Sequence, residues 1–126
     1  LNIKEGSRIL IIGAGTGLDL EFLPINCEIL ATDITPSMVA RIKRRNKSLK
    51  SNVEARVMDG QSLEFQDESF DIIILHLILA VIPDSVKCIL SIKYLVSQDF
   101  FSYNHLLVTF CTKPSVRRHS FIKIGW

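Results

Sequence analysis

The fold is decided by the stretch Arg8-Ile9-Leu10-Ile11-Ile12-Gly13-Ala14-Gly15-Thr16-Gly17. Its first half is almost entirely apolar, which is typical of a strand buried on both faces of a parallel sheet. The three glycines let the chain turn sharply and approach a ligand without a Cβ in the way. A short helix is expected over about residues 16–22, with free N–H groups at its start for polar ligand atoms.

The rest of the chain alternates between predicted strands and predicted helices. Strands are expected at residues 28–32, 52–58, 70–75 and within 100–110, and residues 121–124 can add one short strand. This alternation predicts an α/β fold with a doubly wound, mostly parallel sheet of about five strands, with helices on both faces. In such a sheet, ligands bind at the carboxyl ends of the strands.

Two helices have clear start signals. Thr35-Pro36 supplies an N-cap and a first helical proline, and the helix runs to about Lys47. Pro83-Asp84-Ser85 opens the second helix. The apolar residues near helical spacing are Met38, Val39 and Ile42 in the first helix, expected to point inward, and Val86, Ile89, Leu90 and Tyr94 in the second.

Composition indicates one globular domain over residues 1–126, with 48% hydrophobic and 22% charged residues. A net charge of +2 is too small to argue for a nucleic-acid partner. The odd, scattered set Cys27, Cys88 and Cys111 predicts reduced thiols in a cytoplasmic protein and no metal site. The apolar run at residues 72–82 is shorter than the ~20 residues of a membrane span, so no transmembrane segment is expected.

Asp33 ends the second predicted strand, 20 residues after Gly13. An acidic side chain there accepts hydrogen bonds from ribose hydroxyls, so a nucleoside-bearing ligand is expected. The dinucleotide fingerprint G-x-G-x-x-G needs glycine where this chain has Leu18. A nucleotide-sugar or dinucleotide-binding domain is therefore disfavoured, although it stays open as an alternative.

The glycine spacing 13, 15, 17 resembles the G-x-G-x-G loop of class I S-adenosylmethionine-dependent methyltransferases, which have a Rossmann-like fold. Three further segments resemble the same family, in the right order between about residues 7 and 95. They are Val57-Met58-Asp59-Gly60, Phe65-Gln66-Asp67-Glu68-Ser69-Phe70-Asp71 and Ile82-Pro83-Asp84. Within the family, the chain is most similar to enzymes that methylate quinone precursors, phospholipid head groups or similar small molecules.

The resemblance implies S-adenosylmethionine as cofactor and assigns residues to it. Gly13, Ala14, Gly15, Thr16 and Gly17 make the loop along the methionine part, and Asp33 holds the ribose. Ile34 packs on the adenine, and Asp59 accepts from the adenine amino group, with Gly60 and Gln61 beside it. The implied partner is a small-molecule or lipid methyl acceptor.

His76 follows the fourth predicted strand on the expected acceptor side. It is either a general base or substrate contact, or a partly buried histidine bonded to a backbone carbonyl. Methyl transfer from a sulfonium needs alignment more than a nucleophile or a metal. The segment His76-Leu77-Ile78-Leu79 lacks the Asn/Asp-Pro-Pro-Tyr/Phe signature of nucleobase amino-methyltransferases, so no DNA substrate is expected.

The chain departs from the family pattern in several places. Ile11 stands where the family has an acidic residue, and Ser97-Gln98-Asp99 replaces a Pro-Gly-Gly turn. The chain begins at Leu1 and leaves little room for a lid or for the usual C-terminal hairpin, which indicates a fragment. A truncated or inactive cofactor-binding module is therefore the second hypothesis. An uncovered sheet edge favours a homo-oligomer.

Two basic clusters are left without an assigned role. The first is Arg41, Lys43, Arg44, Arg45, Lys47 and Lys50, and the second is Arg117, Arg118 and His119. The first is interpreted as a solvated helix face, with contact to anionic lipid or RNA as the alternative.

Overall fold

The strands form one sheet in the order β3-β2-β1-β4-β5-β6. The computed structural model describes residues 3–49, 52–76, 83–92, 94–95, 106–110 and 120–123. The strands are β1 (Arg8–Ile12), β2 (Glu28–Asp33), β3 (Asn52–Val57), β4 (Ile72–His76), β5 (Leu106–Phe110) and β6 (Ser120–Lys123). The first five run parallel, and β6 pairs antiparallel with β5. The predicted α/β sheet is confirmed, and the sixth strand is the short one expected near residue 121.

β1 lies between β2 and β4, which explains its apolar sequence. Ile12 pairs with Thr32 on one side and with Leu75 on the other, so three carboxyl ends meet at one edge of the sheet. The side chains from Ile9 to Ile12 are all buried. Because alternate residues of a strand point to opposite faces, β1 contributes to two separate cores.

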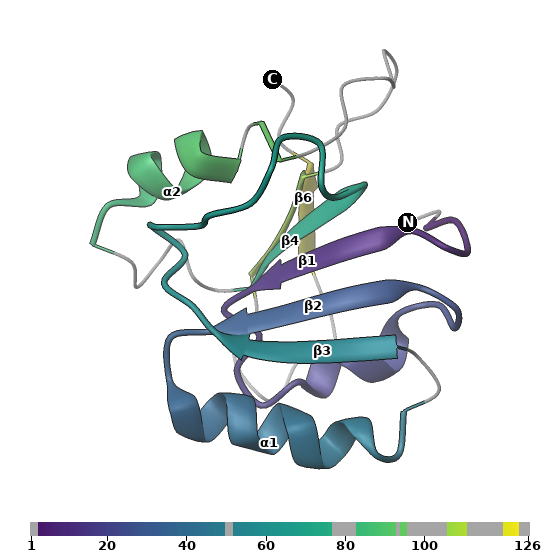
Figure 1. Cartoon of the computed structure of the whole chain (residues 1–126). Helices are drawn as coiled ribbons and strands as arrows, with labels where there is room; N and C mark the ends of the chain where they lie inside the picture. Colours follow the sequence, from purple (N-terminus) through teal and green to yellow (C-terminus); the bar gives the residue numbers. More distant parts are fainter. Residues whose placement is uncertain are drawn as a thin grey trace.

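The two helices cover opposite faces of the sheet (Figure 1). α1 (Pro36–Asn46) packs Val39 and Ile42 into the core that contains Ile9 and Ile11. α2 (Ser85–Ile92) packs Cys88 and Ile92 into the core that contains Leu10 and Ile12. The prediction of helices on both faces is therefore confirmed. None of the helices in the described ranges is long and apolar enough to cross a membrane.

The helix expected over residues 16–22 is shorter and tighter than predicted. It is the five-residue 3-10 helix η1 (Leu18–Phe22), and Gly17 precedes it in the left-handed conformation. Thr35 does occupy the N-cap of α1, with Pro36 in the first turn, but its hydroxyl makes no capping bond. Val39 and Ile42 are buried as expected, whereas Met38 is only partly buried.

The apolar residues noted at helical spacing in α2 are mostly not its buried ones. Val86, Leu90 and Tyr94 are more than half exposed, and Cys88 and Ile92 are the buried residues. Both stripes are apolar at helical spacing, so periodicity alone cannot choose between them. Contact with Phe70 and the β4 side chains decides which stripe is buried. Ser97-Gln98-Asp99, Cys111 and the cluster at residues 117–119 lie outside the described residues.

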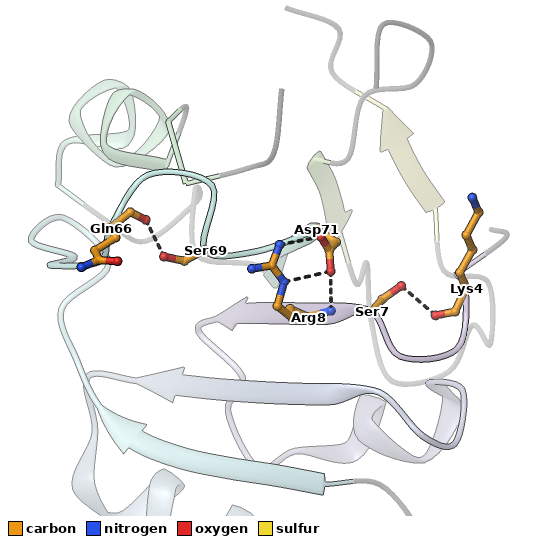
Figure 2. Close-up of polar contacts among 6 residues, drawn as sticks. All are labelled: Lys4, Ser7, Arg8, Gln66, Ser69 and Asp71. Atoms are coloured by element: carbon orange, nitrogen blue, oxygen red, sulfur yellow. Dashed lines mark hydrogen bonds and ion pairs between the residues drawn. The ribbon is translucent and has the colours of Figure 1, made fainter. Parts of the chain in front are cut away.

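An ion pair ties the start of β1 to the chain entering β4. The Arg8 guanidinium donates to Asp71 Oδ1 and Oδ2 at 2.8 and 3.2 Å, and the Arg8 backbone N–H donates to Oδ2 at 2.8 Å. Figure 2 shows the two side chains facing each other, with Ser7 and Ser69 bonded to the carbonyls of Lys4 and Gln66. The bonds to Asp71 raise the pKa of the Arg8 guanidinium.

The two partners of this pair are expected to differ in their contribution to stability. Arg8→Met should lower the free energy of unfolding by at most about 1 kcal/mol, because both side chains are more than a third exposed. Asp71→Ala should cost about 1–2 kcal/mol, because the Arg8 N–H also loses its acceptor. Urea unfolding measures both, and equal losses would contradict the role given to the backbone bond.

Candidate functional site

The glycine loop is bonded to the end of β2. The N–H groups of Gly13 and Ala14 both donate to the Thr32 carbonyl oxygen at 2.9 Å, and the Gly17 N–H donates to the Ala14 carbonyl at 3.0 Å. Thr32 is fully buried, and its hydroxyl donates to the Ile11 carbonyl at 3.0 Å. These contacts hold the first turn of the loop at the carboxyl edge of the sheet.

Asp33 holds the next turn of the loop. Its Oδ2 accepts from the Gly15 N–H at 2.9 Å, and its Oδ1 accepts from the Thr35 N–H at 2.9 Å. Each carboxylate oxygen has about two acceptor sites, so one site on each oxygen is left for a ligand hydroxyl. Ile11, which stands where the family has an acid, is 3% exposed in the core. The carboxylate of Asp33 therefore orders this loop.

Four of the five loop residues have their N–H groups engaged within the protein, and Gly17 is the one of them that lies in the helix expected over residues 16–22. Gly13, Ala14 and Gly17 donate to backbone carbonyls, and Gly15 donates to Asp33. The five-residue η1 adds no extended helix N-terminus beyond them. A pyrophosphate binds at free backbone N–H donors, and the loop leaves few of them. This geometry disfavours a dinucleotide and suits a ligand that is neutral or positively charged at the loop.

Two loop glycines are needed for different reasons. Gly15 has φ +56°, and a Cβ placed there would meet nothing within 4 Å. The backbone at Gly15 is therefore open to close approach by a ligand. Gly17 has φ +74°, and its Cβ would lie 3.0 Å from Leu20 Cδ1 and 3.1 Å from Ile42 Cγ1. Gly17 is therefore required for packing against η1 and α1.

The predicted adenine side lies next to the ribose side. The Met58 N–H donates to the Asp33 carbonyl at 3.1 Å, which brings the ends of β2 and β3 together. Ile34, next to Asp33, is 64% exposed, so its side chain is open for stacking on a base. Asp59 Oδ1 accepts from the Gln61 N–H at 2.9 Å, and Gly60 is buried between them.

This adenine side is also linked to α2. Gln61 Oε1 accepts from the Asp84 N–H at 3.2 Å, and Asp84 Oδ1 accepts from the Lys87 N–H at 2.8 Å. Asp84 thereby caps α2 and joins it to the loop after β3. The start of α2 was predicted from Pro83-Asp84-Ser85, but its bond to Gln61 was not. A bond between positions 23 residues apart leaves no local sequence signal.

Cys88 lies in the core beneath this loop. The thiol is fully buried, and burial together with the Asp59 charge raises its pKa above the ordinary range of a thiol. Cys27 is also buried and free, whereas no group of three or more potential metal ligands occurs within the described ranges. Cys88 therefore stays protonated in the folded protein at neutral pH.

The raised pKa of Cys88 predicts a loss of stability at alkaline pH. Below the unfolded thiol pKa of about 8.5 both states are protonated, so the contribution is fully present. Above it the unfolded thiol ionises before the folded one does, and the free energy of unfolding falls. Urea unfolding at pH 7.5 and 9.5 should show a smaller fall for Cys88→Ala than for the native chain. The same fall in both would contradict this prediction.

Two further residues bear on the site. His76 is the last residue of β4 and pairs with Thr109 of β5, so its backbone leaves the sheet at the carboxyl edge as predicted.

Arg45 makes contacts with the loop that sequence reasoning missed. Its Nε donates to the Thr16 carbonyl at 3.3 Å, and its NH1 donates to Glu21 Oε1 at 2.9 Å. Arg45 therefore fastens the outer side of the loop to α1.

Comparison with known proteins agrees with this geometry. The family model described as a methyltransferase domain matches residues 9–98, which include the loop, Asp33 and Asp59. The chain belongs to the class I S-adenosylmethionine-dependent methyltransferases. The sheet order β3-β2-β1-β4-β5-β6, parallel except for β6, agrees with the Rossmann-like fold of this family.

Similar proteins fall in the classes expected from the sequence. Phosphatidylethanolamine N-methyltransferase of Cereibacter sphaeroides is 30% identical over 87 residues, which are 68% of this chain and 43% of that protein. The ubiquinone/menaquinone biosynthesis C-methyltransferase UbiE of Pectobacterium atrosepticum is 29% identical over 126 residues, 95% of this chain and 49% of that protein. The methyltransferase domain therefore spans less than half the length of either relative.

A solved structure with the same fold is the SAM-dependent methyltransferase of Aquifex aeolicus. It superposes with a TM-score of 0.73 at 21% identity, over 93% of this chain and 63% of the other. S-adenosylmethionine is the cofactor of the family. The residues present fit it, because Gly15 is open to close approach and Asp33 keeps one acceptor site on each oxygen.

Proposed function

We propose that this methyltransferase domain binds S-adenosylmethionine over the glycine loop and transfers its methyl group to a small-molecule or lipid acceptor. The observation that carries the proposal is the contact of Asp33 with Gly15, which joins the ribose position and the loop in one bonded unit. The similarity to enzymes named for phosphatidylethanolamine and for quinone precursors supports the acceptor class.

Each site residue has a defined task in this proposal. Gly13, Ala14, Gly15, Thr16 and Gly17 form the surface along the methionine part of the cofactor. Asp33 accepts from the ribose hydroxyls, and Ile34 packs on the adenine ring. Asp59 accepts from the adenine amino group, with Gly60 and Gln61 shaping the same loop.

The reaction asks for alignment rather than for a nucleophilic side chain. S-adenosylmethionine supplies a methyl group on a sulfonium, which is already a good leaving group. The chain's part is to bind, orient and exclude water at the carboxyl edge of β1 and β4. His76, at the end of β4, takes up the acceptor proton where the acceptor has to lose one.

Calorimetry tests cofactor binding. S-adenosylmethionine and its demethylated product should both bind, and NAD should not. Binding of NAD alone would contradict the proposal.

A screen for transfer of labelled methyl to quinols, amines and phospholipids tests turnover. Cofactor binding without transfer to any acceptor would favour a cofactor-binding module instead.

A His76→Asn variant tests the proposed base. Removing a general base costs about 10²–10⁴-fold in rate, so kcat should fall while the affinity for S-adenosylmethionine stays unchanged. The variant should also lack the part of the native pH dependence of kcat that comes from His76. An unchanged kcat would instead indicate that His76 is a structural residue.

A further inference from the structure

A second feature lies behind the glycine loop, on the outer side of α1. Arg41, Arg44, Arg45 and Ser48, together with Thr16, line a surface groove of about 540 Å³. The spacing i, i+3 and i+4 places the three arginines on one face of α1, and Ser48 lies in the turn after the helix. The chain thus gathers three guanidinium groups at one hollow of its surface.

The charges in this groove are only partly balanced. Arg45 is paired with Glu21 and bonded to the Thr16 carbonyl, so it is fixed in place. Arg41 and Arg44 are exposed, and neither side chain makes an ion pair or a hydrogen bond within the described part of the chain. Two unpaired guanidinium groups therefore border the groove, with a third held rigidly beside them.

Stabilisation of the helix end does not account for this arrangement. Cations in the last turn of a helix complement its dipole, and Lys43, Arg44 and Arg45 occupy that turn. Arg41 stands one turn earlier, yet it lines the same groove. The helix dipole therefore explains the cations at the helix end, but it does not explain why the arginines gather around a groove.

We propose that this groove binds a single phosphate group, with Arg41 and Arg44 as its main donors. The planar guanidinium offers paired N–H donors that match two phosphate oxygens, and two such groups match a dianion better than a carboxylate. The groove shares Thr16 with the glycine loop, but its arginines lie on α1, away from Asp33. Asp33 precedes the first turn of α1, whereas Arg44 lies eight residues into the helix, about 12 Å along its axis.

Binding of defined probes to the whole chain tests the proposal. Inorganic phosphate and glycerol phosphate are titrated at about 150 mM salt, where exposed charges more than ~8 Å apart are screened. Saturable binding of either supports a phosphate site. Vesicles of phosphatidylcholine with and without phosphatidylglycerol form a separate arm. Groove-dependent binding to the anionic vesicles alone would identify a lipid headgroup as the source of the phosphate.

Two double variants on the same helix separate a built site from general charge. Arg41→Gln with Arg44→Gln should weaken binding of the probe at least about tenfold, since both main guanidinium donors to the phosphate are lost. Lys43→Gln with Lys47→Gln removes the same net charge outside the groove lining and should change affinity by less than about twofold. Equal losses in the two variants, or no saturable binding of any probe, would overturn the proposal.

Discussion

Asp33→Ala is expected to weaken binding of S-adenosylmethionine at least about a hundredfold. The variant loses the acceptor for the ribose hydroxyls, and each charge-assisted hydrogen bond contributes about 1.5–3 kcal/mol. It also releases the Gly15 N–H, so the loop loses one of its bonds to β2. Calorimetry on the folded variant measures the change in affinity.

Two further variants separate binding from folding. Asp33→Asn keeps one carbonyl oxygen but turns an amide NH₂ toward the other backbone donor, so its affinity should lie between those of the native chain and Asp33→Ala. Asp71→Ala removes a carboxylate that accepts a backbone N–H at the opposite edge of the sheet. It should lower stability and leave cofactor affinity unchanged. Unchanged affinity in Asp33→Ala would show that the ribose lies elsewhere.

Alanine at Gly17 is expected mainly to lower stability, whereas alanine at Gly15 is expected mainly to weaken cofactor binding. Gly17→Ala should lower the free energy of unfolding by about 2–4 kcal/mol, from a left-handed backbone and overpacking against Leu20 and Ile42. Gly15→Ala should cost only about 1–2 kcal/mol of backbone strain, because its Cβ meets nothing. Its methyl group would instead occupy the ligand side and weaken cofactor binding at least about tenfold.

Gly6→Ala is the matched control for backbone strain. Gly6 has φ +77° with nothing within 4 Å of a Cβ, but it lies before β1 and away from the loop. It should cost about the same stability as Gly15→Ala, since both residues pay only the left-handed penalty of about 1–2 kcal/mol. Cofactor affinity should not change. Equal loss of affinity at Gly6 and Gly15 would contradict the assignment of the loop as the ligand surface.

Local sequence signals predicted most of the fold. The apolar run at Arg8–Ile12, the Thr35-Pro36 start and the Asp84 cap each depend on neighbouring residues, and each element lies within two residues of its expected place. The residues that α2 buries were not predicted, because Val86, Leu90 and Tyr94 form as apolar a stripe as Cys88 and Ile92. Which stripe is buried depends on β4, which lies elsewhere in the sequence.

The candidate site was predictable in its residues but not in its bonds. Glycine spacing and the position of Asp33 pointed to the loop and its acid. The bond from Gly15 to Asp33 and the bond from Arg45 to Thr16 join positions 18 and 29 residues apart. Such pairings depend on how β2 and α1 pack. The hydrogen bonds that engage the N–H groups of the loop could therefore be found only from the three-dimensional structure.

The attachment of the loop to Thr32 and Asp33 has a consequence for how the binding surface arises. The bonds to the N–H groups of Gly13, Ala14 and Gly15 all come from β2. Without β2, Gly13, Ala14 and Gly15 lack the acceptors on Thr32 and Asp33, and only the bond from Gly17 to Ala14 is local. The shape of the binding surface therefore depends on the pairing of β1 with β2 as well as on the glycines.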